Sequence, residues 1–180
     1  SKKLYFDAEE KANKPLWSVS IAGNDVKKLV DNAVNGDARI SAKGTLLVFY
    51  HASYTHPGEI FTAAADGKNF KQLTHVNDPL MSQIGFTEPE SVWFTGANDA
   101  RVQMWIIKPP MFDPGKKYPL VFWVHGGPQG AWLSSWSSRW NPEIWAAQGY
   151  VLALPNPRGS TGFGQKFTDE ISHDWGGKVF

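Results

Sequence analysis

Short apolar stretches separated by polar turns make up the first half of the chain, residues 1 to about 85. Apolar and polar positions alternate within several of them, which is typical of a half-buried β-strand. Gly23-Asn24-Asp25 and Asp66-Gly67-Lys68-Asn69 are turn sequences between such stretches. The pattern predicts strands at Lys3–Phe6, Leu16–Ile21, Lys27–Val30, Thr45–Tyr50, Glu59–Ala63 and Phe70–Thr74.

Two segments in this half of the chain resemble each other when the sequence is shifted along itself by the separation between Leu29 and Leu73. At that offset Leu16-Trp17 aligns with Ile60-Phe61, Gly23 with Gly67 and Val26 with Phe70. A period of roughly 40–45 residues with several short strands per unit is typical of the four-stranded blades of a β-propeller. A generic antiparallel sheet is the alternative. Two blades cannot close a propeller, so the propeller interpretation requires further blades upstream in a longer protein.

From about residue 86 the apolar runs become continuous. Tyr118–Val124 and Tyr150–Leu154 are apolar enough to predict strands buried on both faces, as in a parallel sheet. Trp136–Gln148, followed by Gly149, predicts a helix between them and hence a β-α-β unit. Three more elements are expected: a strand pair Ser91–Phe94 and Gln103–Ile107 joined at Gly96-Ala97-Asn98-Asp99, and a short helix around Gln165–Ile171.

The apolar run ending at Val124 leads straight into His125-Gly126-Gly127-Pro128. Adjacent glycines let the backbone turn sharply, and they leave N–H groups unshielded because they have no Cβ. In α/β-hydrolases the loop after the third strand donates one such N–H to the oxyanion of acyl transfer. The motif therefore predicts acyl-transfer chemistry.

Composition excludes several other classes of function. The formal net charge of +1 over 180 residues gives no reason to expect nucleic acid or an anionic membrane as partner. The absence of cysteine excludes disulfides and thiol catalysis. The histidines lack metal-ligand spacing, and no phosphate-binding glycine motif occurs. No metal and no cofactor are therefore expected.

The serine nucleophile of an α/β-hydrolase lies in Gly-x-Ser-x-Gly, followed in the chain by an acidic residue and a histidine. Ser160 comes nearest to this pattern, with Gly162 after it but Arg158 at the position of the first glycine. No serine of the chain fits, so no member of a triad is identified. Four of the histidines are interpreted as surface or loop residues: His51, His56, His75 and His173.

Five of the nine tryptophans fall within a short segment, which marks either a dense core or an aromatic-lined pocket. They are Trp123, Trp132, Trp136, Trp140 and Trp145. Core packing is the favoured interpretation for Trp136 and Trp140. Trp132, directly after the glycine turn, is left open between core packing and contact with a substrate.

Three motifs in order resemble the prolyl oligopeptidase family of serine peptidases: His125–Pro128, Asn156–Gly164 and Asp174–Gly177. Gln129–Trp132 together with Arg139–Pro142 is most similar to the branch of dipeptidyl peptidase V and the acylaminoacyl-peptidases. The resemblance implies the last blades of a β-propeller over residues 1–86, followed by the N-terminal half of an α/β-hydrolase domain over 87–180. It places the nucleophile elbow shortly beyond residue 180.

The resemblance also implies roles for residues of the glycine turn. Gly127 would donate its backbone N–H to the oxyanion, while the second donor, the N–H after the nucleophile, lies outside this chain. His125 belongs to the same oxyanion loop, at a position where related peptidases carry a tyrosine. Its ring either assists the oxyanion site or braces the loop by hydrogen bonding. Pro128, Gln129 and Trp132 are expected to contact substrate.

The expected function is therefore part of a serine exopeptidase that cleaves peptide bonds near substrate N-termini through an acyl-enzyme. Its partners would be a peptide substrate and a companion chain or missing segment carrying the triad, without which this chain is inactive. An esterase or lipase of the same fold and a non-catalytic propeller module for protein interaction remain alternatives. The resemblance points to a secreted or periplasmic location, with a cytoplasmic one left open.

Overall fold

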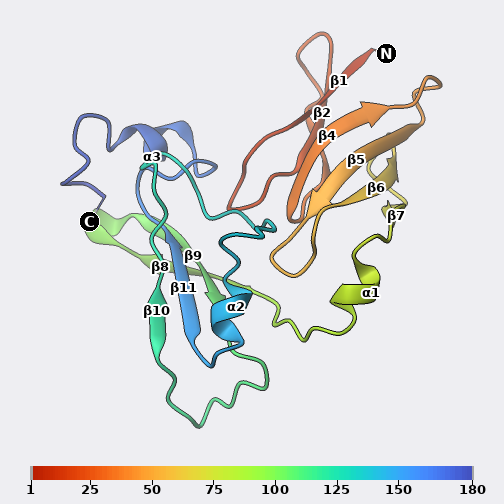
Figure 1. The fold of residues 1–180 in the computed structure, drawn as a ribbon. Helices are drawn as coiled ribbons and strands as arrows, with labels where there is room; N and C mark the ends of the chain where they lie inside the picture. Colours follow the sequence, from red (N-terminus) through yellow and green to blue (C-terminus); the bar gives the residue numbers. More distant parts are fainter. Residues whose placement is uncertain (1, 180) are drawn as a thin grey trace. The chain divides into compact units, whose positions relative to one another are not determined.

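The structure is a computed structural model that describes residues 2–179 (Figure 1). The chain divides into two compact units at Ile84/Gly85, and Leu133–Trp136 belongs to the first unit. Strands dominate both units. None of the helices in the described residues has the length and apolar character needed to cross a lipid bilayer.

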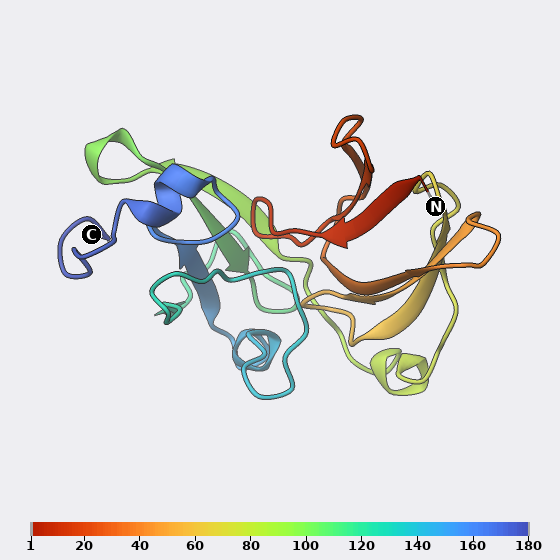
Figure 2. The ribbon, with the colours of Figure 1, turned by 90° about the horizontal axis from the view of Figure 1, so that it is seen from above.

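Unit 1 contains two antiparallel sheets in which consecutive strands are neighbours (Figures 1 and 2). The first sheet has the order β1-β2-β3, and the second has the order β4-β5-β6-β7. The strands are β1 (Lys3–Asp7), β2 (Leu16–Ser20), β3 (Lys27–Val30), β4 (Val34–Ile40), β5 (Leu46–Ala52), β6 (Glu59–Ala64) and β7 (Lys71–Gln72). All six strands expected in this region are confirmed within a few residues at their ends.

A shared apolar core holds the two sheets of unit 1 together. It contains Leu16 and Val30 from the first sheet and Leu47, Phe49, Phe61 and Ala63 from the second. Within β5 and β6 these residues are two positions apart, so they lie on one face of their strand. Burying a large side chain of this kind contributes about 1.5–3 kcal/mol, which makes this cluster the main source of stability in the unit.

Strand β4 was not predicted from the sequence. Its Asn35-Gly36-Asp37 segment has the composition of a turn, but the chain forms a bulge there instead. The register against β5 shifts between Gly36 and Arg39, and Asp37 has a φ of 53°. A bulge accommodates turn-type residues within a strand because the extra residue leaves the ladder of hydrogen bonds.

The interpretation of His51 as a surface or loop residue is wrong. His51 lies on β5 at the inward-facing position that follows Leu47 and Phe49, and its side chain is buried. Its Nδ1 lies 2.8 Å from Oδ1 of buried Asn35, and its ring packs 4.6 Å from that of Phe61, centroid to centroid. His56 lies in a partly buried loop, whereas His75 and His173 are exposed, as expected.

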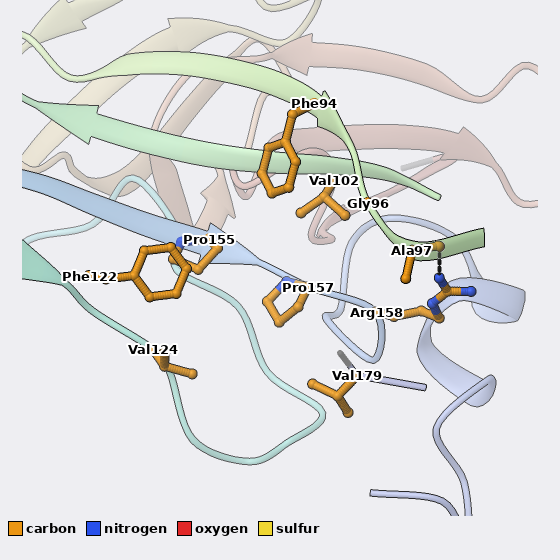
Figure 3. Close-up of a pocket in the computed structure, with 10 residues that line it drawn as sticks. All are labelled: Phe94, Gly96, Ala97, Val102, Phe122, Val124, Pro155, Pro157, Arg158 and Val179. Atoms are coloured by element: carbon orange, nitrogen blue, oxygen red, sulfur yellow. Dashed lines mark hydrogen bonds between the residues drawn. The ribbon is translucent and has the colours of Figure 1, made fainter. Parts of the chain in front are cut away.

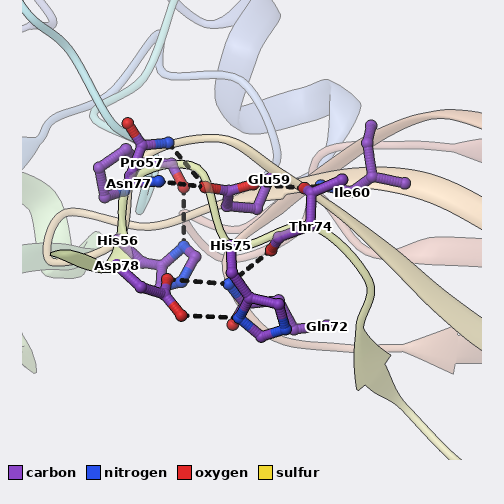
Figure 4. A network of polar contacts seen from close by, with 9 residues as sticks. All are labelled: His56, Pro57, Glu59, Ile60, Gln72, Thr74, His75, Asn77 and Asp78. Carbon is purple, nitrogen blue, oxygen red and sulfur yellow. Dashed lines mark hydrogen bonds and ion pairs between the residues drawn. The ribbon is translucent and has the colours of Figure 1, made fainter.

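A polar network fixes the segment after β7 to the start of β6 (Figure 4). The buried Glu59 carboxylate accepts hydrogen bonds from the Thr74 hydroxyl and from the backbone and side-chain N–H groups of Asn77, the last two at 2.8 Å. Burial alone would raise the pKa of Glu59, but these hydrogen bonds lower it below its ordinary value. The network positions α1 (Asp78–Met81), whose Asp78 also accepts from Gln72 and contacts His75.

Unit 2 contains a mixed sheet with the order β10-β11-β9-β8. β10 and β11 are parallel, whereas β9 is antiparallel to both of its neighbours. The strands are β8 (Glu90–Thr95), β9 (Arg101–Ile107), β10 (Leu120–Phe122) and β11 (Val151–Asn156). The expected strand pair is confirmed as β8 and β9, with η1 (Ala97–Asp99) at the turn between them. The strand expected at Tyr150–Leu154 is confirmed as β11, and the short helix expected around Gln165–Ile171 is confirmed as α3 (Gln165–Asp169).

Two predictions for unit 2 are wrong. The strand expected to be buried on both faces is the short β10, in which Leu120 and Phe122 are about 60% exposed, because the described residues do not cover the face that carries these side chains. The expected long helix is reduced to α2 (Glu143–Ala146). Pro142 has no N–H to continue a helix from the preceding residues, and Asn141 Oδ1 instead accepts the Glu143 N–H at 3.0 Å, so the helix begins there.

Candidate active site

The glycine turn lies in a loop of residues 123–132 that follows β10, the third strand of its sheet in chain order. The loop starts where the Trp123 N–H donates to the Ala153 carbonyl of β11 at 2.8 Å. Gly127 is exposed with a φ of +140°, and the Gly127–Pro128 peptide bond is cis. Within the described residues the Gly127 N–H donates to no acceptor of the chain, so it is free to bind a ligand oxygen.

The ring of His125 connects this loop to the turn after β11. Its Nδ1 lies 2.9 Å from the carbonyl oxygen of Gly126, and its Nε2 lies 2.9 Å from the hydroxyl of Ser160. A serine next to a histidine is also the arrangement of an activated nucleophile. Ser160, however, is fully buried, and its hydroxyl donates a hydrogen bond to the Pro157 carbonyl at 2.6 Å. The contact between His125 and Ser160 therefore has a structural role and attaches the loop to the turn after β11.

The other end of the loop is fixed by residues that the sequence analysis missed. Oδ1 of Asn156, at the end of β11, accepts the Trp132 N–H at 2.7 Å, and its Nδ2 donates to the Trp132 carbonyl at 3.2 Å and to Gln103 Oε1 at 2.6 Å. Asn156 and Gln103 are both fully buried. The available signal was an amide side chain in the strand sequence that contains Gln103 and another directly after the apolar run Tyr150–Leu154, because buried polar groups require a partner.

The three residues expected to contact substrate lie in this loop but differ in their surroundings. Gln129 is exposed, donates to the Thr168 carbonyl at 3.2 Å and borders a hollow of about 480 Å³ together with His173 and Trp175. Pro128 and Trp132 are half-buried. The Trp132 indole N–H donates to the Trp123 carbonyl at 2.8 Å, which gives this side chain a structural contact. Their roles toward a substrate remain predictions.

An apolar cavity of about 320 Å³ lies in unit 2 beside the strand that leads into the loop (Figure 3). Phe122 and Val124 form part of its wall, and Pro155 and Pro157 another part. At one end, the Arg158 guanidinium donates to the Ala97 carbonyl, and it also pairs with Glu170. Apart from Arg158, the described residues that line this cavity are apolar or glycine, so the unpartnered N–H of Gly127 remains the candidate donor to a substrate in this region.

Core packing is the wrong interpretation for Trp140. This side chain is 52% exposed and meets Trp123 edge to face, with ring centroids 5.9 Å apart. It lies on the irregular segment before Pro142, which does not form the helix that would have turned it inward. Trp136 is half-buried in unit 1.

The described residues contain no group of three or more histidine and acidic side chains arranged to hold a metal ion. An unpartnered backbone N–H such as that of Gly127 can donate a hydrogen bond to a developing negative charge.

Solved structures share this fold. Pyrococcus horikoshii acylaminoacyl peptidase superimposes with a TM-score of 0.83 at 24% identity, over 99% of this chain and 27% of that one. Porphyromonas gingivalis dipeptidyl peptidase 4 superimposes with a TM-score of 0.71 at 20% identity, over 94% of this chain and 25% of that one. The fold is thus one that occurs within solved peptidases.

Sequence comparison gives the family. The model of the prolyl oligopeptidase family matches residues 136–180. Dipeptidyl-peptidase 5 of Trichophyton equinum is 40% identical over 183 residues, and that of Arthroderma otae is 40% identical over 185 residues, in each case over 98% of this chain. The chain is therefore similar to the prolyl oligopeptidase family, as the motifs predicted. It spans about a quarter of the length of these curated relatives.

Proposed function

We propose that this chain forms part of a serine exopeptidase and supplies the loop that binds the oxyanion of the acyl-transfer transition state. The observation that carries the proposal is the exposed, unpartnered N–H of Gly127 in a loop that is tied to β11 and the turn after it. A donor held in place before the reaction stabilises developing charge without reorganisation, which is why such donors contribute strongly to catalysis.

The substrate would be a peptide, and attack on its carbonyl would come from a serine that this chain does not contain. Gly127 would donate to the carbonyl oxygen as it becomes negative, and His125 would brace the loop through Ser160. Pro128, Gln129 and Trp132 would border the bound peptide. The names dipeptidyl-peptidase 5 and acylaminoacyl peptidase among the similar proteins support release of a short unit from the substrate N-terminus.

We further propose that residues 1–86 form blades of a β-propeller and residues 87–180 the first part of an α/β-hydrolase domain. In support, the sequence offset of the repeat superimposes β1, β2 and β3 on the positions of β5, β6 and β7. The sheet β4-β5-β6-β7 is a four-stranded meander, the form of a propeller blade. The parallel pair β10–β11 and the loop after the third strand support the hydrolase assignment.

Labelling with a fluorophosphonate, read on a denaturing gel, tests the proposed function in a preparation of the protein that contains this chain. We expect label on a serine outside these residues: on a companion chain, or on a polypeptide longer than the 20.0 kDa of this segment. Label on a 20 kDa band would contradict the absence of a nucleophile from this sequence. A correctly folded preparation without any label would contradict the peptidase assignment.

The type of exopeptidase can be tested with two coumarin amides of equal length, one with a free N-terminal amine and one acetylated. A dipeptidyl peptidase requires the free amine, and an acylaminoacyl peptidase requires the blocked one. We expect cleavage of the free dipeptide, because relatives named dipeptidyl-peptidase 5 are 40% identical to this chain. Preference for the acetylated substrate would overturn this assignment while leaving the serine chemistry intact.

A further inference from the structure

We infer that Asn156 is a positioning residue that holds the oxyanion loop at the geometry in which the Gly127 N–H can act. The inference rests on the proposed function and adds to it a residue that does not itself reach a substrate, because Asn156 is fully buried.

The Asn156 carboxamide binds both polar groups of one peptide residue in the loop. Oδ1 accepts the Trp132 N–H at 2.7 Å, and Nδ2 donates to the Trp132 carbonyl at 3.2 Å. A neighbouring strand would satisfy a residue in the same way. Asn156 therefore takes the place of a neighbouring strand in satisfying the backbone groups of Trp132, and it attaches the end of an irregular loop to the sheet.

A second buried amide determines the orientation of Asn156. Its remaining N–H donates to Gln103 Oε1 at 2.6 Å, and Gln103 faces Asn156 in the register of β11 and β9. Gln103 Nε2 in turn donates to the Ser91 hydroxyl on β8 at 3.1 Å. With its acceptor and donors engaged in this way, the amide cannot rotate without leaving buried groups unpaired, which is costly in a low-dielectric interior.

The side chain of Trp132 in turn connects the two ends of the loop. The indole N–H donates to the Trp123 carbonyl at 2.8 Å, so the last residue of the loop binds the first. The Trp105 indole N–H also donates to the Trp132 carbonyl, at 2.9 Å. Gly127 lies between these closed ends, and its N–H direction depends on both of them.

The test compares Asn156→Ala and Asn156→Asp with the wild type in the complete peptidase that contains this segment. Aspartate preserves the shape of asparagine and the acceptor for the Trp132 N–H. When ionised it donates to neither the Trp132 carbonyl nor Gln103, and when protonated it can donate to only one of them. We expect both variants to lose about 10- to 100-fold in kcat per active site, with KM little changed. A displaced Gly127 N–H would stabilise the transition state less but would affect the binding of the substrate little. Active sites are counted by fluorophosphonate titration.

The second readout is binding of a peptide aldehyde, whose tetrahedral adduct places an oxygen at the oxyanion position. Its affinity should fall by the same factor as kcat, whereas the affinity for a product peptide should not. Leu154→Ala is the matched control, because Leu154 is buried on the same strand and has no hydrogen bond to the loop through its side chain. This variant should lower the number of active sites while keeping kcat per site.

Wild-type kcat per site in Asn156→Ala would overturn the positioning role. A loss confined to Asn156→Ala would overturn the part of that role assigned to the two hydrogen bonds that Nδ2 donates, because aspartate keeps the shape of the side chain and the acceptor for the Trp132 N–H. Hydrogen exchange of residues 123–132 separates this outcome from failure of the proposed function. If the wild type neither labels nor cleaves, the proposed function fails. The positioning role then stands only if both Asn156 variants raise exchange in this loop and the Leu154→Ala control does not.

Discussion

The proposed binding of an oxyanion by this loop depends on the conformation of one residue, Gly127. Its φ of +140° is a region that residues with a side chain rarely adopt, and a Cβ added there would lie 2.8 Å from the backbone nitrogen of Gln129. The residue before it differs. A Cβ on Gly126 would have no heavy atom within 4 Å, and its φ is not in the left-handed region.

These adjacent glycines form a matched pair for mutation. Gly127→Ala should rotate the peptide group that carries the oxyanion donor and lower kcat by about 10²–10³, the usual effect of losing one such donor. Gly126→Ala should cause a much smaller loss. Steady-state kinetics on the complete peptidase, normalised to fluorophosphonate-labelled sites, measures both. Equal losses in the two variants would show that the loop tolerates no Cβ at all and that Gly127 has no special role.

At the scale of single residues, the motif and the site were predictable to different degrees. Gly127 and His125 could be chosen from sequence because local chemistry marks them: paired glycines after an apolar run. Asn156, Gln103 and Ser160 act through partners distant in the chain, as in the contact between His125 and Ser160. A single sequence does not state which buried amide faces which loop. The pairing of Asn156 with Gln103 emerges only from the register of β11 and β9, and the role of Ser160 emerges only from its contact with His125.

At the scale of elements, strands were predicted more successfully than helices. Alternation of apolar positions, as in β5 and β6, is a local property and located those strands. The extent of α2 depends on Asn141-Pro142, where the missing N–H of Pro142 and the hydrogen bond from the Glu143 N–H to Asn141 Oδ1 outweigh the apolar spacing of the preceding residues. The burial of β10 depends on what covers the faces of the strand, which its own sequence does not contain.

The unpaired edge of β10 leads to a prediction about the chain in isolation. One edge of this strand has no partner in the described sheet, and its Leu120 and Phe122 side chains are exposed. Unpaired apolar edges associate with other strands. We expect the 180-residue chain alone to self-associate in size-exclusion chromatography with light scattering, and Phe122→Lys to reduce the association.

Met111→Lys is the control for this experiment, because Met111 is 96% exposed and apolar but lies outside any strand. It should leave the association unchanged. A wild-type chain that is folded and monomeric at micromolar concentration would contradict the edge interpretation.

At the scale of the whole molecule, the two units contain buried ionisable groups whose effects on stability have opposite signs. In unit 1, burial and, to a smaller extent, the neighbouring His56 lower the pKa of His51 from 6.5 to about 4. Between these values the unfolded chain binds a proton that the folded unit does not, so stability is present above pH 6.5 and is lost as the pH falls toward 4.

In unit 2, burial and, to a smaller extent, the charge of Glu88 raise the pKa of Glu143 from 4.5 to about 7, against a hydrogen bond from the Thr87 N–H. The Glu143 Oε1 atom is buried without a hydrogen-bond partner among the described residues, which is consistent with a protonated carboxyl. Here the folded unit binds a proton that the unfolded chain has released. Its stability is therefore highest below pH 4.5 and is lost as the pH rises through 7.

The two units should thus respond in opposite directions when the pH is raised from 5 to 6.5. Hydrogen exchange, corrected for the intrinsic pH dependence, can follow β5 in unit 1 and β11 in unit 2 within the same sample. The opening free energy should rise in β5 and fall in β11, each by at most about 1.4 kcal/mol per pH unit for one proton. His51→Gln should remove the response of β5 alone, and Glu143→Gln that of β11 alone. Parallel changes in both strands would mean that the chain opens as a single cooperative body in which neither buried group governs its own unit.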